Sequence, residues 1–294
     1  MTDPKQHKTG FRPARVEAKD AEQQAAETPQ TLDPSYRLAF QDTEFLLRPD
    51  LRPVRFQLEL LKPELLLDEA NIATTFVFYG SARIPEPSRA DALIELAATE
   101  QQRRIAERLK AKAHYYDEAR ELARRVSRIP PNPDGERQFV VCSGGGPSIM
   151  EAANRGAADE GQESIGLNIV LPHEQAPNGY VTPSLSFRFH YFALRKMHFL
   201  LRARAVAIFP GGFGTFDEAF ELLTLVQTGK VREMPILFFG RDYWERVVNF
   251  EALVEEGVIS ATDLELFTFC ETADEAWDAV CRHYAGSEED PLNC

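Results

Sequence analysis

Residues 210–218, with the sequence PGGFGTFDE, combine the residue types that bind phosphate with a carboxylate that can take part in catalysis. Glycines let the backbone approach a ligand closely, and the free N–H groups at a helix start attract an anion. An apolar run precedes the segment and a helix is expected to follow it. The residues predicted to bind phosphate here are Gly211, Gly212, Gly214 and Thr215.

Glu218 is the candidate catalytic carboxylate of this segment. The apolar stripe expected on the following helix runs through Phe216, Ala219 and Leu223, so Glu218 lies off the stripe and can face a cleft. The alternative is a capping box, with Thr215 as the N-cap and Glu218 three residues later. No lysine follows the glycines, which excludes a Walker P-loop. The spacing alone leaves both roles of Glu218 open.

A second glycine segment, SGGGPS over 143–148, also lies between an apolar run and an expected helix. Gly144, Gly145 and Gly146 are predicted to contact a ligand, again because a helix start favours an anion. The alternative is a tight turn with a Ser148/Glu151 capping box. The segment lacks the G-x-G-x-x-G spacing, and no acid ends a second strand at the expected place, so NAD is disfavoured.

Two further pairs of residues complete the candidate site. Gly80 and Ser81 end the apolar run 74–79, and we expect them at the same ligand. Arg195 and Lys196 stand beside aromatic residues, and two such cations can pair with a phosphate or a carboxylate. A solvated basic helix face is the alternative for this pair.

Short apolar runs alternate with helical patterns along most of the chain. This alternation predicts an α/β fold, a Rossmann-like doubly wound parallel sheet with helices on both faces. Ligands bind such sheets at the carboxyl ends of the strands, near the point where strand order reverses. A long helical region, with room for one break, is expected over about 87–128, followed later by a helix over 241–256 and a closing helix over 273–284. The expected strands are 74–79, 139–142, 164–170, 186–190, 205–209, 236–239 and 267–270.

The composition divides the chain into four parts. Residues 1–32 are polar and are expected to form a disordered tail, because they can bury little apolar surface. Residues 33–72 mix apolar side chains with prolines and predict a helical arm, broken at Pro49, Pro53 and Pro63. The Rossmann-like nucleotide-binding catalytic domain is expected over 73–286, and a C-terminal tail over 287–294.

The net charge of −13, from 33 basic and 46 acidic side chains, argues against nucleic-acid and membrane partners. A single phosphate remains acceptable, because a nest of backbone N–H groups binds it whatever the net charge. The four cysteines form no CxxC pair, so no metal site and no cofactor are expected. The polar N-terminus has no signal-peptide core, which predicts a cytoplasmic location.

In order and spacing these motifs resemble the LONELY GUY family, whose members were long labelled "lysine decarboxylase-like". The family signature P-G-G-x-G-T-x-x-E corresponds to 210–218, and its second glycine loop and helix to 143–157. The Arg195-Lys196 pair and the loop 80–83 also agree. The resemblance covers about 73–285, and the extension before residue 73 resembles that of longer bacterial forms.

The resemblance implies an N-glycosidase that cleaves a nucleoside 5′-monophosphate, a cytokinin riboside monophosphate or AMP, into free base and ribose 5-phosphate. It implies Arg195 and Glu218 as the catalytic pair, the glycine loops and Lys196 at the nucleotide, and a homodimer or higher homo-oligomer. Decarboxylation is not implied, because nothing marks a pyridoxal phosphate lysine.

Two positions depart from the family pattern and bear on the choice of base. Phe192 stands where plant-type members have methionine, and Ser148 stands where glycine is common. The main alternative function is a non-catalytic nucleotide or molybdenum-cofactor carrier, because related folds carry that cofactor. A carrier would not need Glu218 and Arg195 together. A DNA-processing protein is disfavoured by the acidic charge.

Overall fold

The computed structural model describes residues 12–24, 26–172 and 176–285, which form two compact units, Met1–Leu58 and Glu59–Cys294. The boundary falls inside helix α4 (Arg52–Glu69) rather than at residue 72, where the composition changes. Helix α4 begins with Pro53 in its first turn, where proline is tolerated, and continues through Pro63. The predicted break at Pro63 is therefore wrong.

The first unit consists of short helical segments: α1 (Ala14–Gln24), α2 (Pro29–Leu32), 3₁₀ turns at Pro34–Tyr36 and Pro49–Leu51, α3 (Thr43–Leu46) and the start of α4. Helices α1 and α2 occupy part of the stretch 1–32, for which the composition predicts disorder. Ala, Glu and Gln favour helix locally, and a Thr28–Thr31 capping box starts α2. Residues 1–11 and 287–294, which include the predicted C-terminal tail, lie outside the described residues.

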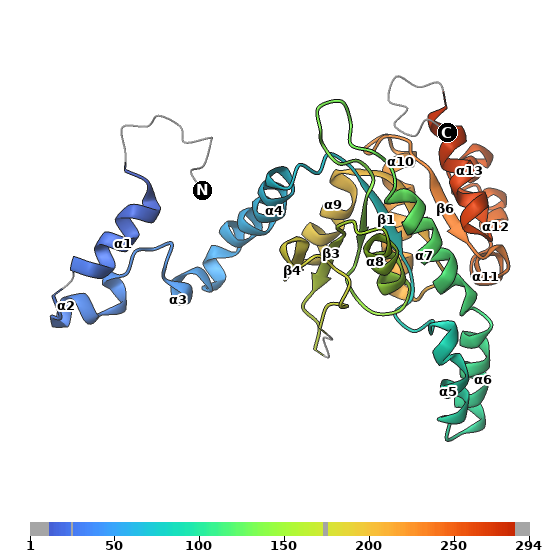
Figure 1. The fold of residues 1–294 in the computed structure, drawn as a ribbon, viewed down its shortest axis with the longest axis horizontal. Coiled ribbons are helices and arrows are strands. Elements are labelled where there is room, and N and C mark those ends of the chain that lie inside the picture. The colour runs from blue at the N-terminus through green and yellow to red at the C-terminus, as the bar shows by residue number, and fades with distance from the viewer. Residues whose placement is uncertain (1–11, 25, 173–175, 286–294) are drawn as a thin grey trace. The chain divides into compact units, whose positions relative to one another are not determined.

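The second unit is built on a seven-stranded, fully parallel sheet in the order β4-β3-β2-β1-β5-β6-β7 (Figure 1). The strands are β1 (Thr75–Tyr79), β2 (Val140–Ser143), β3 (Ile165–Ile169), β4 (Ser186–Phe189), β5 (Ala203–Ile208), β6 (Ile236–Phe239) and β7 (Thr268–Cys270). The predicted strands and fold class are thus confirmed. The inner strands are buried on both faces of the sheet, as is usual for parallel strands, whereas the edge strands β4 and β7 each expose one residue.

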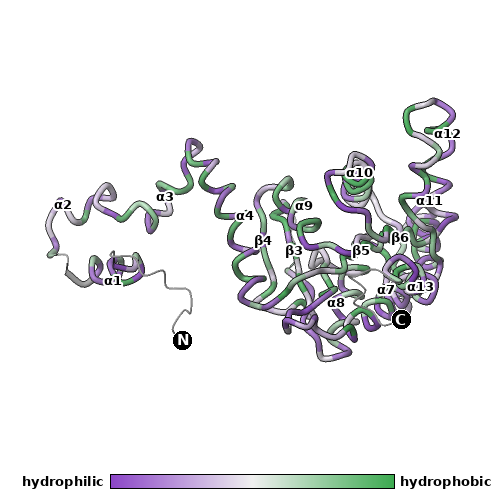
Figure 2. The backbone as a smooth tube through the Cα atoms, turned by 90° about the horizontal axis from the view of Figure 1, so that it is seen from above, coloured by the Kyte–Doolittle hydropathy of each residue, from purple (hydrophilic) through white to green (hydrophobic). Residues whose placement is uncertain are grey.

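Two apolar cores cover the two faces of the sheet. Phe76 and Phe78 of β1 pack with α7, α8 and α13, and Val77 and Tyr79 pack with α9, α10 and α11. Figure 2 colours the backbone by hydropathy, and hydrophobic residues occur along the strands. The helices of the second unit are α5 (Ala90–Glu95), α6 (Glu100–Lys110), α7 (His114–Val126), α8 (Ile149–Asp159), α9 (Phe192–Leu201), α10 (Phe213–Gln227), α11 (Arg241–Val247), α12 (Phe250–Glu255) and α13 (Ala273–Tyr284).

The long helical regions expected from sequence are interrupted by local caps. The region 87–128 contains a 3₁₀ turn (Pro87–Arg89), α5, α6 and α7, and a Thr99–Gln102 capping box starts α6. The region 241–256 is divided into α11 and α12, where the Asn249 side chain accepts from the Ala252 N–H. Among the helices of the described residues, none has the length and apolar composition needed to cross a membrane.

Strand order reverses between β1 and β5. From β1 the chain adds β2, β3 and β4 on one side, and then returns to place β5 on the other side of β1. The loops after β1 and β5 therefore flank the switch point, where open α/β sheets bind their ligands. These loops begin at Gly80 and at Phe209.

We predict that Gly156→Ala lowers the free energy of unfolding by about 1–3 kcal/mol, because the site has no room for a methyl group. A Cβ at Gly156 on α8 would overlap the Arg120 carbonyl oxygen of α7 and lie 2.7 Å from Ala123 Cβ. Urea denaturation measures the change. Gly179→Ala is the matched control: its Cβ meets nothing within 4 Å, so it should change stability by less than about 0.5 kcal/mol. Equal stability of the two variants would contradict tight α7–α8 packing.

Candidate functional site

The three glycine loops predicted from sequence lie together at the carboxyl ends of β1, β2 and β5. The Ser81 N–H of the first loop donates to the Pro210 carbonyl of the third at 3.2 Å. The Ser148 hydroxyl of the second donates to the Ile84 carbonyl, just beyond the first. These bonds join loops that are far apart in sequence at the switch point of the sheet.

The third loop leads directly into α10. A Cβ at Gly211 would overlap the Thr215 side chain, so only glycine fits there, and the Tyr243 hydroxyl donates to the Gly211 carbonyl. By contrast, a Cβ at Gly212 or Gly214 would meet nothing within 4 Å. The loop is thus fixed by its neighbours on one side and open at the start of the helix, where N–H groups suit an anion.

A buried polar network supports the second loop. The Ser143 hydroxyl donates to Asn154 Oδ1 at 2.7 Å and accepts from the Gly145 N–H at 3.0 Å. Asn178 donates its backbone N–H to the Gly145 carbonyl at 2.8 Å and its side-chain amide to the Gly146 carbonyl at 2.9 Å. Because Ser143 and Asn154 are fully buried, these bonds fix the loop in one conformation.

Arg195 and Glu218 form an ion pair between α9 and α10. Arg195 Nη1 donates to Glu218 Oε1 at 2.8 Å, and the two side chains are only 10% and 12% exposed. The predicted catalytic residues, 23 positions apart in sequence, are therefore in direct contact. A pair with this little exposure is shielded from water, so its charges act more strongly on a bound ligand than surface charges would.

Three contacts fix the Arg195 side chain in position. Its Nε donates to the Leu167 carbonyl of β3 at 2.6 Å, and its guanidinium lies over the Phe199 ring at 4.8 Å. A Cβ at Gly144 would lie 2.6 Å from Arg195 Nη2, so the second glycine loop passes directly beside the guanidinium. A side chain at position 144 would therefore have to displace the guanidinium, which its other contacts hold in place.

Burial and neighbouring charges act in opposite directions on the Glu218 carboxylate. Loss of water raises the pKa of Glu218 above its ordinary value, and the Arg195 guanidinium limits the rise. At the end of β1, burial together with the negative charge of Glu218 raises the pKa of the Tyr79 hydroxyl well above its ordinary range. Tyr79 also meets Phe199 edge to face at 5.0 Å. The centre therefore combines one fixed cation with a carboxylate that is easier to protonate than usual.

Both capping-box alternatives are wrong. Helix α10 begins at Phe213 with Gly212 as its N-cap, which makes Thr215 the third helical residue, and Glu218 pairs with Arg195 instead. Ser148 precedes α8, but its side chain caps nothing, and Glu151 accepts from the Tyr116 hydroxyl at 3.1 Å. Both acids are therefore used for tertiary contacts.

Lys196 has a different position from its neighbour Arg195. Its Nζ lies 3.0 Å from Asp217 Oδ1 and 3.1 Å from Glu221 Oε2, both on α10. Lys196 would have to leave these carboxylates to contact a phosphate at the loops. Ser81 is also engaged, since its Oγ accepts from the Arg83 N–H at 3.0 Å.

Three polar residues beside the loops, Tyr79, Asn168 and Asn178, were not expected from the sequence. A Cβ at Gly145 would lie 2.6 Å from Asn168 Oδ1, so Asn168 of β3 lies against the second loop. Tyr79 could have been found, because it immediately precedes Gly80 and alternates with Phe78 to the opposite face of β1. Asn178 lies in a loop with no periodic signal, and nothing in the sequence marks it.

The raised pKa of Glu218 predicts a pH dependence of stability. A carboxyl with a higher pKa in the folded than in the unfolded state stabilises the fold when protonated, and this contribution is lost as pH rises through the folded pKa. The free energy of unfolding of wild type should therefore fall relative to that of Glu218→Gln as pH rises from 4.5, the ordinary value of the carboxyl. Urea denaturation of both proteins across this window measures the difference.

Asp217→Asn is the control, because it keeps Glu218 and should follow wild type across the same window. The two unfolding curves of wild type and Glu218→Gln differ by a constant offset as well, since the glutamine leaves Arg195 without its counter-ion. Only the slope with pH tests the assignment. A difference that is flat, or that moves in favour of wild type as pH rises, would contradict it.

A model of one protein family, described as possible lysine decarboxylase, matches residues 150–280. Cytokinin riboside 5′-monophosphate phosphoribohydrolase LOG3 of Arabidopsis thaliana is 27% identical over 168 residues, which span 56% of this chain and 73% of that protein. LOG2 of the same plant is 27% identical over 155 residues, spanning 51% and 68%. Probable LOG4 of Oryza sativa subsp. japonica is 27% identical over 145 residues, spanning 48% and 61%.

Among solved structures, a structural-genomics target is 18% identical with a TM-score of 0.44, covering 71% of this chain and 99% of that chain. A Moco carrier protein from Chlamydomonas reinhardtii is 17% identical with a TM-score of 0.40, covering 71% and 96%. The family model and the plant relatives agree with the resemblance carried by the glycine loops and the Arg195–Glu218 pair. The chain is thus similar, over residues 150–280, to the family described as possible lysine decarboxylase, and over about half of its length to these plant phosphoribohydrolases.

Proposed function

We propose that this protein hydrolyses the N-glycosidic bond of a nucleoside 5′-monophosphate. Water adds to C1′ of the ribose, the bond to the base breaks, and the products are ribose 5-phosphate and the free base with its proton. The relatives in Arabidopsis and rice are named for this activity on cytokinin riboside 5′-monophosphates. The ion pair of Arg195 and Glu218, buried beside the glycine loops, is the observation that carries the proposal.

Glu218 supplies the negative charge that the reaction needs. Cleavage of a glycosidic bond passes through an oxocarbenium-like sugar, and positive charge grows on the ribose. A carboxylate in a water-poor site stabilises that charge strongly, and it can also orient or deprotonate the attacking water. Arg195 holds one carboxylate oxygen of Glu218. The side chain keeps 12% of its surface exposed, which leaves room for contact with a ligand.

Arg195 acts by position and charge. An arginine does not release its proton near neutral pH, so it is not the acid that protonates the leaving base. Its Nη1 holds Glu218 and its Nε is fixed by the Leu167 carbonyl, which favours a role in orienting the carboxylate. The sequence had left this role open between the base, the phosphate and Glu218.

The glycine loop before α10 is the part of the site that we expect to bind the 5′-phosphate. Its N–H groups at the start of the helix and the open space at Gly212 and Gly214 suit a phosphate group. Phosphate binding supplies energy away from the reacting bond and fixes the ribose against Glu218. Phe213, which is 97% exposed between these glycines, is available to contact the nucleotide or a second subunit.

The test is product analysis after incubation with AMP, GMP, CMP, UMP and isopentenyladenosine monophosphate. Wild type should release free base and ribose 5-phosphate from at least one of them. Glu218→Gln should lower the turnover number by at least about 100-fold while nucleotide binding remains, because the amide keeps the shape and loses the charge. Asp217→Asn is the matched control, since it removes the neighbouring exposed carboxylate and should retain turnover.

Two results would contradict the proposal. Near-normal turnover in Glu218→Gln would remove Glu218 from the mechanism. Absence of base release from all five nucleotides, combined with tight nucleotide or pterin binding, would instead favour the carrier function. Chromatography of the bases and a coupled assay for ribose 5-phosphate distinguish these results.

A further inference from the structure

The second half of α4, residues 59–69, lies in the second unit and contacts α9, the helix that carries Arg195. It belongs to the extension before residue 73, to which the proposed reaction assigns no role. Three of its acidic side chains, Glu59, Glu64 and Asp68, bind the residues at the two ends of α9. Because α4 is fixed to α9 in this way, it can influence the position of Arg195.

The Glu59 carboxylate binds the residues that lead into α9. Its Oε1 accepts from the His190 N–H at 2.9 Å, and its Oε2 accepts from the Tyr191 N–H at 3.2 Å. Tyr191 is the N-cap of α9, and its own side chain does not cap the helix. A carboxylate at this end also suits the positive end of the helix dipole. Glu59 therefore fixes the point at which α9 begins.

The backbone of Glu59 holds α9 a second time. His198 Nε2 lies 3.1 Å from the Glu59 carbonyl, and a carbonyl only accepts, so Nε2 carries the proton at this contact. The His198 side chain is buried, and burial lowers its pKa below the ordinary value, which favours the neutral ring. His198 lies in the last turn of α9. One residue of α4 therefore binds α9 both at its start and near its end.

Arg195 lies between these two contacts. Its backbone N–H donates to the Tyr191 carbonyl at 3.1 Å, so the residue that Glu59 holds is also a hydrogen-bond partner of Arg195. The Arg195 guanidinium must meet Glu218 at 2.8 Å and the Leu167 carbonyl at 2.6 Å. A displacement of about 1 Å at a catalytic group can cost about 100-fold in rate. A shift of the start of α9 would therefore be felt at the ion pair.

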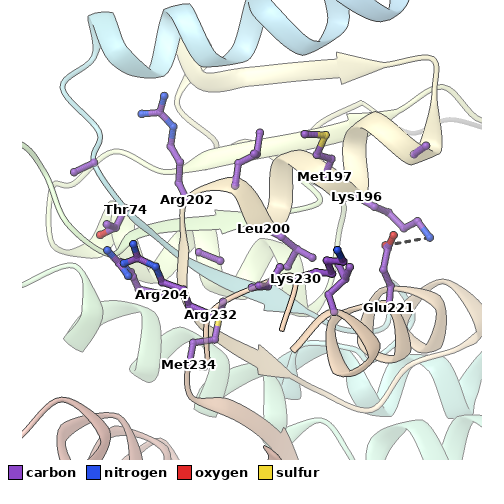
Figure 3. Close-up of a pocket in the computed structure, with 16 residues that line it drawn as sticks. Thr74, Lys196, Met197, Leu200, Arg202, Arg204, Glu221, Lys230, Arg232 and Met234 are labelled. Carbon is purple, nitrogen blue, oxygen red and sulfur yellow. Dashed lines mark ion pairs between the residues drawn. The ribbon is translucent and has the colours of Figure 1, made fainter. Parts of the chain in front are cut away.

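The far end of α9 is held by other residues of α4. Arg202, the C-cap of α9, places Nη2 3.0 Å from Glu64 Oε2 and 2.8 Å from Asp68 Oδ1. Figure 3 shows Arg202 at the wall of a cavity of about 680 Å³, with its side chain directed toward α4. This end lies about two turns after Arg195. The Asp68 contact thus joins the same two helices without involving the start of α9.

We propose that Glu59 is a positioning residue of the candidate catalytic centre, which holds the start of α9 so that the Arg195 guanidinium stays paired with Glu218. The inference rests on the proposed function. It assigns a role in catalysis to a part of the chain that precedes the nucleotide-binding domain. Glu59 acts through α9 and needs no contact with the nucleotide.

Steady-state kinetics of Glu59→Ala on the best nucleotide substrate tests the proposal. The turnover number should fall by at least about tenfold, because Arg195 loses its fixed position. The KM should change by less than about threefold, because the phosphate loop is held by separate contacts at Pro210 and Gly211. Glu59→Gln should lose less turnover than Glu59→Ala, since its amide oxygen can still accept one of the two N–H groups.

Asp68→Asn is the matched control. It weakens a contact between the same two helices, but at the end of α9 away from the start, and Arg202 keeps Glu64. Its turnover number should stay within about twofold of wild type, because the Asp68 side chain is exposed. Circular dichroism in the assay buffer gives the folded fraction of each variant, so that turnover is compared per folded molecule.

Hydrogen exchange followed by mass spectrometry gives a readout that needs no activity. Glu59→Ala should speed exchange of the backbone amides of 190–195 by at least about tenfold, because the start of α9 loses its partner. Asp68→Asn should leave these amides unchanged. The exchange therefore reports whether Glu59 holds α9, and the kinetics report whether that hold serves catalysis.

Three results would overturn the proposal while leaving the hydrolase function in place. These are unchanged turnover per folded molecule in Glu59→Ala, equal loss of turnover in Glu59→Ala and Asp68→Asn, and unchanged exchange at 190–195. A wild type that releases base from none of the nucleotides would overturn the hydrolase function, and the catalytic role of Glu59 with it. Active wild type is therefore the result that separates the two failures.

Discussion

A guanidinium taken out of water has to keep a counter-ion and acceptors for its N–H groups, and Arg195 obtains both from fixed parts of the fold. Glu218 supplies the charge from α10, and the Leu167 carbonyl supplies an acceptor from β3. Removing Glu218 would leave a buried charge uncompensated, and losing the carbonyl would leave a buried N–H without an acceptor; both changes are unfavourable. The requirement therefore ties the positions of α9, α10 and β3 to one another at the switch point of the sheet.

The glycine loops are packed closely against this ion pair and the helix that carries Glu218. Gly144 has no room for a Cβ because Arg195 Nη2 lies beside it, and Gly211 has none because Thr215 turns back against it. Gly212 and Gly214 are open, which leaves the start of α10 accessible. Some glycines thus allow close packing at the centre, and others leave open space at the start of the helix. A second ion pair, Lys196–Glu221, joins the same two helices farther from the loops.

The fold could be predicted largely from sequence because its signal is strong. The five inner strands are short apolar runs, almost wholly buried between the two faces of a parallel sheet, and glycines follow several of them; the edge strands β4 and β7 are partly exposed. The interruptions of the long helical regions could not be placed, since they depend on single caps such as Asn249. The continuation of α4 through Pro63 and the helices of the first unit were also not predicted. Composition indicates how much apolar surface a segment can bury, but it says less about local helix propensity.

The candidate site could likewise be predicted only in part from the sequence. The residue types of the loops and of Arg195 and Glu218 suggested chemistry, but the sequence could not decide between a catalytic acid and a helix cap. The start of α10 at Phe213 and the contact between α9 and α10 exclude the helix cap, and the catalytic role stays a proposal. Lys196 is directed to Asp217 and Glu221. Asn178 holds the second loop. Both positions depend on tertiary packing, which no local sequence pattern encodes.

The central claim is that Arg195 and Glu218 act as one unit, and a double-mutant cycle on turnover tests it most directly. Arg195→Met, Glu218→Gln and the double variant are compared with wild type on the best nucleotide substrate, with the folded fraction of each protein measured in the same buffer. The account predicts that each single change removes most of the activity and that the double variant is hardly worse than the more damaged single. Losses that multiply, as for two independent groups, would contradict it.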